Sequence, residues 1–339
     1  MIREAIAKLI DKKDLKKEEI EDCFEEIMTG EATPGQIGAF LTALRLKGET
    51  VEEITGAAIV MRAHATKVNA KVDIVLDTCG TGGDVSGTFN ISTISAFVAA
   101  GAGAVVAKHG NRSVSSMCGS ADLLMALGIN IELNANDVER CIQEIGIGFL
   151  YAPLLHGAMM YATPVRKEIG IRTIFNILGP LTNPAGSRHQ LLGVYDERLT
   201  DKLALVLKNL GSEHALVVHG KDGLDEVTTT ADTVVSELKK DELRTYRINP
   251  KDFGIKKAKP EDLKGKDPKT NAKIATKVLK GEDGPQMDIV LLNTGCALYA
   301  CDIASSVKEG IERAKESIKS GKALQKLNKL IEISKRQAE

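Results

Sequence analysis

The sequence lacks the features that place a chain in a membrane or on a secretory route. No apolar run approaches the roughly 20 residues that cross a bilayer. Residues 1–17 are charged throughout and contain no hydrophobic stretch of the kind that a secretory signal needs. Tryptophan is absent too, although this absence excludes no class of protein. We therefore expect a cytoplasmic protein that has no membrane partner.

An excess of either charge is also missing. The 339 residues contain 45 Lys and Arg against 46 Asp and Glu, which leaves a net charge of −1. Such a balance provides no general attraction to nucleic acid or to anionic lipid. We expect no nucleic-acid partner, and any phosphate binding must come from a local group of residues.

The cysteines form neither a metal pattern nor a disulfide pattern. None of the six belongs to a CxxC pair, and their spacing does not match a zinc site. Scattered cysteines of this kind usually behave as small hydrophobic side chains. We expect reduced, buried thiols at Cys23, Cys79, Cys118, Cys141, Cys296 and Cys301.

The first 70 residues carry helix signals and no strand pattern. Thr33 and Pro34 are typical of a helix start, because proline is tolerated at the first helical position. Thr50 and Glu53 have the spacing of a capping box, which predicts another helix start. With 43% apolar residues, the chain is long enough for a large domain beside this smaller helical one.

Strand and helix patterns alternate after residue 72. Because parallel strands are joined by crossover helices, this alternation predicts an α/β domain with a mainly parallel sheet. The segment 239–268 is charged and poor in large apolar residues, and we interpret it as a surface excursion. Strands are expected at 72–76, 104–107, 191–195 and 215–219, and helices at 92–102, 120–127, 199–210 and, as a pair, 303–334.

A second helical stretch interrupts the alternation at 163–178, where Pro164 stands at a helix start. We expect this segment to return to the N-terminal helical domain. The predicted helical domain therefore comprises residues 1–70 plus about 163–190. The predicted α/β domain comprises residues 71–162 plus about 191–339.

A glycine-rich loop follows the first expected strand. The segment 77–84 reads DTCGTGGD, and 88–93 reads TFNIST at a helix start. Glycines let backbone N–H groups approach an anion, and a helix N-terminus adds positive potential. The Gly-Lys-Ser/Thr of a P-loop and the GxGxxG of dinucleotide sites are both absent. The loop predicts a phosphate site, with a tight strand-to-helix turn as the alternative.

A polar loop follows the second expected strand, and its segment 108–116 reads KHGNRSVSS. Parallel sheets bind ligands at the carboxyl ends of their strands, and this mixture of cations, amide and hydroxyls suits phosphate and sugar oxygens. Ser120, at the next helix start, would add another donor. The alternative is a solvated polar loop.

Adjacent carboxylates, Asp225 and Glu226, follow the strand expected at 215–219. Two carboxylates at a strand end repel each other unless a cation lies between them. Magnesium is the natural candidate, because it binds carboxylates together with substrate phosphate oxygens. An ordinary acidic turn is the alternative.

A fourth group lies on the segment that returns to the helical domain. It comprises His156, the PVRK of 164–167 with Arg166, and the stretch that begins at Arg172 and reads RTIFNILGPLTNP. We expect this group to face the cleft between the domains, although any single arginine is more often simply solvated.

Seven motifs occur in a fixed order between about residues 30 and 300. They read GTGGD, TFNIST, KHGNRSVSS, GSAD, PVRK, RTIFNILGPLTNPA and DGLDE. In this order they resemble anthranilate phosphoribosyltransferases. The resemblance implies a small N-terminal helical domain hinged to a large α/β domain, the fold class shared with pyrimidine nucleoside phosphorylases. It also implies a homodimer formed through the helical domain.

The activity implied by this resemblance is phosphoribosyl transfer in tryptophan biosynthesis. Diphosphate would leave C1 of phosphoribosyl diphosphate, and the amine of anthranilate would attack with inversion, giving N-(5-phosphoribosyl)anthranilate. The cofactor implied is Mg²⁺, two ions per subunit. Because an arylamine is neutral at pH 7, no strong base is required, and His109 would accept the proton late.

The resemblance also assigns roles to individual residues. Ser92 would bind one magnesium ion, and Asp225 with Glu226 a second. Anthranilate would contact Gly80, Asn111 and Arg166, with His109 and His156 as auxiliary residues. Phosphoribosyl diphosphate would contact Gly80, Gly83, Asp84, Thr88, Asn90, Ile91, Ser92, Thr93, Lys108, His109, Gly110, Asn111, Arg112, Ser113, Val114, Ser115, Ser116 and Ser120.

Two other functions remain open at this point. A pyrimidine nucleoside phosphorylase would use the same fold with inorganic phosphate and a nucleoside, but it needs no metal bridge to diphosphate. The acidic pair and the NIST segment at 90–93 therefore disfavour it. A non-catalytic relative that binds nucleic acid would need a basic surface, which the net charge of −1 disfavours.

Overall fold

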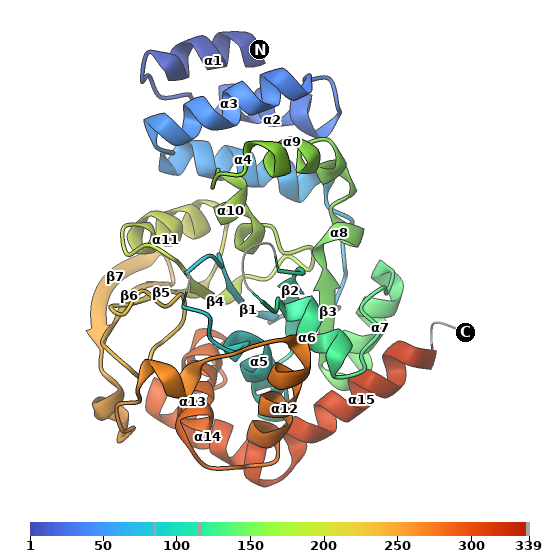
Figure 1. Ribbon diagram of the computed structural model, residues 1–339, viewed down its shortest axis with the longest axis vertical. Helices are drawn as coiled ribbons and strands as arrows, with labels where there is room; N and C mark the ends of the chain where they lie inside the picture. The colour runs from blue at the N-terminus through green and yellow to red at the C-terminus, as the bar shows by residue number, and fades with distance from the viewer. Residues whose placement is uncertain (85, 114–116, 337–339) are drawn as a thin grey trace.

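The N-terminal part of the protein is a group of four helices, as the computed structural model shows for the described residues 1–84, 86–113 and 117–336 (Figure 1). Thr33 and Thr50 accept hydrogen bonds from the backbone N–H groups of Gln36 and Glu53, at 3.3 and 3.2 Å. Both predicted helix starts are therefore confirmed. The helices are α1 (Ile2–Ile10), α2 (Lys17–Met28), α3 (Pro34–Lys47) and α4 (Val51–His64).

A seven-stranded sheet forms the centre of the larger part. Its spatial order is β3-β2-β1-β4-β5-β6-β7, with parallel pairing from β3 to β5 and antiparallel pairing of β6 and β7. The predicted mainly parallel α/β fold is confirmed. The strands are β1 (Leu76–Gly80), β2 (Val106–Gly110), β3 (Ile147–Tyr151), β4 (His189–Gly193), β5 (His214–Gly220), β6 (Thr233–Lys239) and β7 (Glu242–Ile248).

The interpretation of 239–268 as a surface excursion was wrong for its first part. Residues Glu242–Ile248 form β7, which pairs along its whole length with β6. As the edge strand of the sheet, β7 exposes most of its side chains, so its composition resembles that of a loop. Backbone hydrogen bonds to β6, rather than apolar burial, make this segment a strand.

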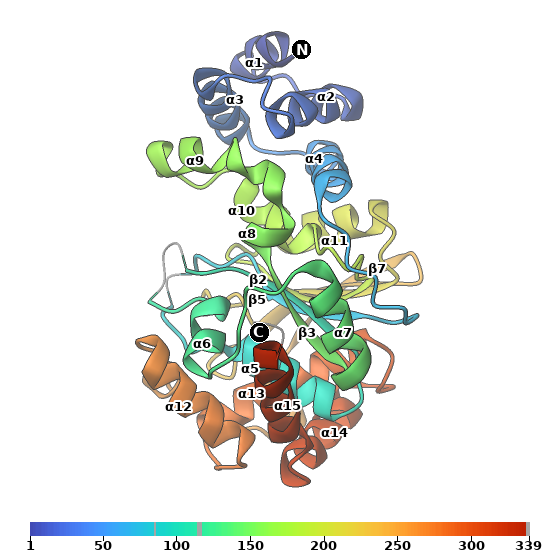
Figure 2. The same cartoon turned by 90° about the vertical axis from the view of Figure 1, so that its right-hand side faces the viewer.

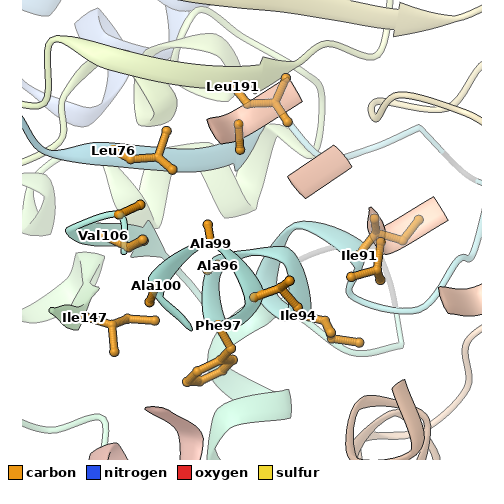
Figure 3. Packing of buried hydrophobic residues seen from close by; sticks show 14 of the residues in the cluster. Leu76, Ile91, Ile94, Ala96, Phe97, Ala99, Ala100, Val106, Ile147 and Leu191 are labelled. Atoms are coloured by element: carbon orange, nitrogen blue, oxygen red, sulfur yellow. The ribbon is translucent and has the colours of Figure 1, made fainter. Parts of the chain in front are cut away.

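Helix α5 (Ile91–Gly101) packs against one face of the parallel strands. Figure 3 shows Ala96, Ala99 and Ala100 facing side chains of the sheet, including Leu76 and Val106. Small residues let this helix approach the sheet closely, and the start of α5 is thereby fixed beside the end of β1. Further helices are α6 (Ser120–Ala126), α7 (Ala135–Ile145), α11 (Leu199–Asn209), α12 (Pro268–Leu279), α13 (Pro285–Ala300), α14 (Val307–Lys319) and α15 (Lys322–Arg336).

The segment between β3 and β4 returns to the N-terminal helices. Phe175 belongs to the same buried cluster as Phe24 of α2, and their ring centroids are 5.5 Å apart. Figure 2 shows α9 beneath α3. The domain boundaries at 70, 163 and 190 stay a prediction. The segment contains α8 (Ala152–Leu155), η1 (Gly157–Met160), α9 (Thr163–Ile169), α10 (Phe175–Leu178) and η2 (Gly179–Leu181). Elsewhere in the chain, two short helices follow β7: η3 (Pro250–Phe253) and η4 (Pro260–Leu263).

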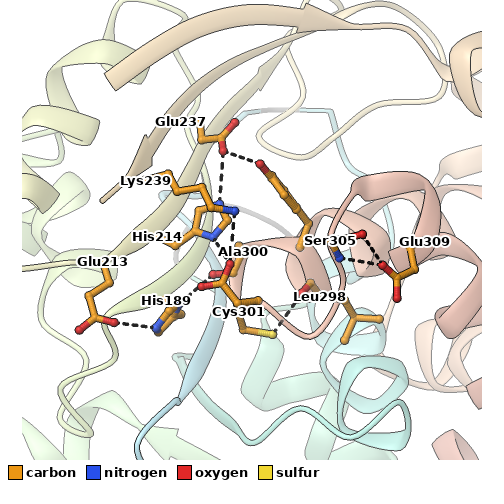
Figure 4. Close-up of polar contacts among 12 residues, drawn as sticks. His189, Glu213, His214, Glu237, Lys239, Leu298, Ala300, Cys301, Ser305 and Glu309 are labelled. Atoms are coloured by element: carbon orange, nitrogen blue, oxygen red, sulfur yellow. Dashed lines mark hydrogen bonds and ion pairs between the residues drawn. The ribbon is translucent and has the colours of Figure 1, made fainter. Parts of the chain in front are cut away.

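A buried polar network fastens the antiparallel edge of the sheet to α13. Glu237 of β6 accepts hydrogen bonds from the hydroxyls of Tyr299 and Tyr246, both at 2.8 Å, and from Arg244 at 2.8 Å. His214 of β5 lies 3.4 Å from the same carboxylate (Figure 4). Several partners therefore stabilise one fully buried charge.

The cysteines are as expected: all six are free and buried. Among the helices that the structure describes, none has both the length and the apolar character needed to cross a membrane.

Candidate active site

The predicted motifs meet at the carboxyl ends of the parallel strands. Gly80 at the end of β1 pairs with Gly193 of β4, which pairs in turn with Val218 near the end of β5. The carboxyl ends of these parallel strands are therefore level, and the loops that follow them lie together. The loops after β1, β2 and β5 are those that carry the glycine-rich, polar and acidic motifs.

The glycine-rich loop is bound to the acidic loop. The backbone N–H of Gly82 donates a hydrogen bond to Oδ2 of Asp225 at 2.8 Å. A Cβ atom at Gly80 would lie 2.7 Å from the same oxygen, so a larger residue would displace the carboxylate. Gly82 and Gly83 have φ values of 66° and 76°, which favour glycine. The sequence thus forms this loop because only glycine permits both its turn and its close approach to Asp225.

Asp225 and Glu226 concentrate negative charge beside this loop. Burial, and then repulsion from Asp84, raises the pKa of Asp225 to about 7. Burial, and then repulsion from Asp225, raises the pKa of Glu226 to about 8. Glu226 accepts a hydrogen bond from the backbone N–H of Ser92 at 3.1 Å. Neighbouring carboxylates whose charges are this unfavourable fit a site for a divalent cation.

These carboxylates do not form a complete metal site by themselves. In the described ranges, no three side chains of His, Cys, Asp or Glu are gathered in a metal-binding arrangement. Mg²⁺ usually takes only one or two protein carboxylates and completes its shell with water and substrate phosphate oxygens. The donor set at Asp225, Glu226 and Ser92 matches that pattern.

A buried lysine lies beneath the glycine-rich loop. Lys108 donates to the backbone carbonyl of Thr78, and its Nζ lies 3.4 Å from Oγ of Ser92. Burial lowers the pKa of Lys108, whereas the neighbouring Asp77 carboxylate raises it. Asp77 accepts hydrogen bonds from the His109 backbone N–H at 3.2 Å and from Asn183 at 2.8 Å. The Lys108 side chain, at the carboxyl end of β2, is thus held close to the start of α5.

Asp122 organises the polar loop that follows β2. Its carboxylate accepts hydrogen bonds from the backbone N–H groups of Ser113 and Gly119, at 3.1 and 2.9 Å. The Ser120 hydroxyl donates to the Asn111 carbonyl at 3.2 Å. The loop therefore folds back on the start of α6. Three predicted phosphate-binding residues, Val114, Ser115 and Ser116, lie outside the described residues.

The side chain of Asn90 is used to join elements. Its amide group donates to the Cys118 carbonyl at 3.0 Å, and its oxygen accepts a hydrogen bond from Asn271 at 3.0 Å. Thr88 forms an isolated β-bridge with Lys264. These contacts position the backbone before α5.

His109 of β2 and His156 face each other. His156 belongs to the segment between β3 and β4, residues 152–188, which we call the return segment. Their Nε2 atoms are 3.2 Å apart, and Nδ1 of His109 lies 3.2 Å from the Gly179 carbonyl. Burial is the main reason that the pKa of His109 falls to about 3 and that of His156 to about 4. Both imidazoles are therefore neutral at pH 7 and can accept or relay a proton.

The two arginines of the return segment have different surroundings. Arg166 of α9 is half-buried, with its guanidinium 5.1 Å from the Phe175 ring centroid, and burial lowers its pKa. Arg172 donates to the Gly83 carbonyl, and its guanidinium lies 4.4 Å from the Tyr195 ring centroid. Arg172 thus connects the return segment to the glycine-rich loop.

Comparisons with known proteins assign nearly the whole chain to one family. Residues 3–65 match the helical bundle domain, and residues 72–324 the a/b domain, of a glycosyl transferase family. Anthranilate phosphoribosyltransferase of Acetivibrio thermocellus is 56% identical over 334 residues, which cover 98% of this chain and 97% of that protein. The chain belongs to the anthranilate phosphoribosyltransferase family.

Solved structures of anthranilate phosphoribosyltransferases have the same fold. The Thermus thermophilus structure is 42% identical, with a TM-score of 0.93 over 98% of this chain and 99% of that one. The Saccharomyces cerevisiae enzyme in complex with PRPP and Mg is 31% identical, with a TM-score of 0.90 over 99% and 98% of the two chains. The predicted family, fold and enzyme class are confirmed.

The structure brings some of the predicted site residues together and not others. Direct contacts join the glycine-rich loop, Ser92, Lys108, Asp225 and Glu226. In the part of the chain that the structure describes, no hydrogen bond or ion pair joins Arg166 to Gly80 or Asn111. The assigned roles of the individual residues in binding stay predictions.

Four residues outside the predicted site set hold the site in place: Asp77, Asp122, Arg172 and Asn183. All four lie inside or beside the recognised motifs, so their position was a usable signal. The Asp122–Gly119 hydrogen bond is local, but the contacts that join these residues to other elements span 9 to 106 residues along the chain. Local spacing does not reveal such pairings.

Proposed function

We propose that this chain transfers the phosphoribosyl group from phosphoribosyl diphosphate to the amine of anthranilate, releasing diphosphate. The observation that carries this proposal is the Asp225–Glu226 pair, which is held against the glycine-rich loop by the Gly82 hydrogen bond. Such a pair beside an anion-binding loop suits a metal-bound diphosphate. The product would be N-(5-phosphoribosyl)anthranilate, an intermediate of tryptophan biosynthesis.

Asp225, Glu226 and Ser92 are the residues that would hold Mg²⁺, and we propose two ions per subunit. Magnesium, when bound, offsets the charge that grows on the departing diphosphate. The mutual repulsion of the carboxylates, which adds to burial in raising their pKa values, would be offset in the same step.

Backbone N–H groups of the glycine-rich loop and of the start of α5 would bind the phosphates. Lys108 is buried beside Ser92 and would add fixed positive charge. Because these groups are already in place, little reorganisation is needed as charge develops. The polar loop would bind the remaining phosphate and ribose oxygens through its backbone and hydroxyl groups.

Arg166, Gly80 and Asn111 would bind anthranilate. A planar guanidinium matches a planar carboxylate in two parallel hydrogen bonds. The neutral His109–His156 pair joins the end of β2 to the return segment and would accept the amine proton after bond formation. Neutral imidazoles suit this late role, because a strong base is not needed for an arylamine.

We also propose a cytoplasmic homodimer that associates through the N-terminal helices. Leu46 of α3 and Ile10 of α1 have 80% and 69% of their surface exposed. These two exposed side chains, on helices that share one buried cluster, are the observation that supports association through this domain. The proposed boundary between the domains lies at about residues 70, 163 and 190.

The decisive assay is loss of anthranilate fluorescence when the protein is incubated with phosphoribosyl diphosphate and Mg²⁺. The expected result is a loss that depends on all three components. A parallel reaction with thymidine or uridine and inorganic phosphate tests the phosphorylase alternative. Phosphorolysis without any loss of anthranilate would overturn the proposal.

A further inference from the structure

A pocket of about 320 Å³ opens beside the antiparallel edge of the sheet, apart from the residues assigned above. Its walls carry four basic side chains and two polar ones: Lys221, Arg247, Lys251, Lys257, Asp232 and Asn249. None of these residues belongs to the recognised motifs that bind phosphoribosyl diphosphate or anthranilate.

Strand register brings these residues together. Gly220 at the end of β5 pairs with Thr233 at the start of β6, which pairs with Ile248 at the end of β7. The residues that flank these three positions therefore meet at one corner of the sheet. Lys221, Asp232 and Arg247 come from that corner, and Lys251 follows in η3. The pocket is thus a product of the fold and not of one mobile segment.

Positive charge in the pocket exceeds negative charge. Lys221 pairs with Glu197 at 2.6 Å, and Asp232 accepts a hydrogen bond from Asn249 at 2.5 Å. Arg247, Lys251 and Lys257 have no ion-pair partner among the residues that the structure describes. The pocket walls therefore carry four cations and one carboxylate, with Glu197 and Asp252 just outside them, so positive charge remains in excess and suits an anion.

We propose that this pocket binds a phosphate monoester. A phosphate dianion matches the charge excess, and the Arg247 guanidinium can bind two phosphate oxygens at once. The volume of about 320 Å³ is within the range of small-molecule sites and exceeds the need of a bare phosphate. The remaining space, lined by Asn249 and Pro250, would take the organic part of the molecule.

The pocket shares a loop with the acidic pair. The Lys221 backbone N–H donates to the Asp232 carbonyl at 2.8 Å, and the Gly220 N–H donates to the Leu224 carbonyl at 2.8 Å. Asp225 follows Leu224 directly. A ligand held by Lys221 would therefore stiffen the loop that presents Asp225 to the glycine-rich loop.

The test measures binding of AMP to the full chain by titration calorimetry in EDTA, so it does not depend on transferase activity. We expect Arg247→Gln with Lys251→Gln to weaken AMP binding at least tenfold. Lys308→Gln with Lys329→Gln, two exposed lysines of α14 and α15, is the matched control and should change binding less than twofold. Equal affinity of the wild type and the pocket variant would overturn the proposal, as would equal weakening in the control.

Two further measurements locate the ligand and define its class. In crystals soaked with tungstate, a phosphate mimic, anomalous density is expected between Arg247 and Lys251; density at the glycine-rich loop alone would overturn the proposal. Inorganic phosphate should bind more weakly than AMP, and equal binding would overturn the inference that an organic part is accommodated. If the double variant does not fold by circular dichroism, Lys257→Gln tests the same pocket and should weaken AMP binding at least threefold.

Discussion

The backbone N–H of Gly82 and the Oδ2 atom of Asp225 form a 2.8 Å hydrogen bond between residues that are 143 positions apart. This bond joins the loop that would receive diphosphate to the carboxylate that would bind metal. Binding of metal to Asp225 therefore affects the diphosphate site, and binding of diphosphate affects the metal site, because Asp225 contacts the glycine-rich loop directly. Substrate and magnesium are expected to bind with positive coupling.

Removal of the acidic pair should nearly abolish activity. Asp225→Ala with Glu226→Ala deletes the proposed metal ligands and the partner of Gly82. The matched control is Glu282→Ala with Asp283→Ala, an exposed pair of adjacent carboxylates, which should retain full activity. Initial rates over a magnesium titration measure both. Full activity of the Asp225/Glu226 variant in EDTA would show that the metal assignment is wrong.

The Glu237 network predicts a loss of stability in acid. Burial alone would raise the pKa of Glu237, but hydrogen bonds from His214, Tyr299, Tyr246 and Arg244 outweigh it and lower the pKa to about 2. A carboxylate with a depressed pKa stabilises the folded state above its unfolded pKa of 4.5, and this contribution disappears as the pH falls toward 2.

Glu237→Gln tests this prediction by thermal unfolding between pH 7 and pH 2. The variant should be about 2–3 kcal/mol less stable at pH 7, because charge-assisted hydrogen bonds are lost in a buried place. It should also show a smaller decline below pH 4.5 than the wild type. Parallel declines of the two proteins would contradict the role of Glu237.

The dimer prediction concerns the exposed apolar residues of α1 and α3. Light scattering at micromolar concentration should give twice the chain mass for the wild type. Ile10→Asp with Leu46→Asp should give a monomer, since charges would be placed in the apolar contact. Leu205→Asp, on α11 and 41% exposed, is the control that should remain a dimer. A monomeric wild type would contradict the proposal.

Local signals in the sequence predicted much of the fold. Thr33 and Thr50 marked helix starts correctly, because a cap is a contact between residues three positions apart. The expected strands had the right order along the chain, but β1 and β2 begin later than expected, at Leu76 and Val106. Strands β3, β6 and β7 were not predicted. In β7, pairing with β6 and contacts to Glu237 decide the structure, and both come from elsewhere in the chain.

The candidate site was predictable as motifs but not as contacts. The glycine-rich and acidic motifs showed which loops matter, because their chemistry is visible in the residue types. The Asp77–Asn183 hydrogen bond and the contact of Arg172 with Gly83 span 106 and 89 residues. Such pairs depend on the level ends of the strands, which the spacing along the chain does not specify.

Arg172 should control the glycine-rich loop and not anthranilate. Its guanidinium donates to the Gly83 carbonyl and lies over the Tyr195 ring. Arg172→Ala removes this support, so the Michaelis constant for phosphoribosyl diphosphate should rise about tenfold while that for anthranilate stays within twofold. Steady-state kinetics with each substrate varied in turn measures both constants. A rise confined to anthranilate would contradict this role.

Arg166 should have the opposite effect. Anthranilate carries one negative charge, and a cation that is not occupied by the diphosphate can bind its carboxylate without competition. Arg166 is half-buried against Phe175, so its charge is poorly hydrated and ready for an anionic partner. A charge-assisted contact contributes roughly 1.5–3 kcal/mol. Arg166→Ala should therefore raise the Michaelis constant for anthranilate by about ten- to a hundredfold.

The companion variant Arg166→Lys keeps the charge but loses the planar pair of donors, so it should recover only part of the affinity for anthranilate. Lys167→Ala, next to Arg166 and exposed, is the control and should leave both Michaelis constants unchanged. If Arg166→Ala instead raised the constant for phosphoribosyl diphosphate and left that for anthranilate unchanged, Arg166 would belong to the phosphate site. Opposite responses of the Arg166 and Arg172 variants would separate the two substrate sites within one segment of the chain, because Arg166 in α9 and Arg172 just after it are only six positions apart.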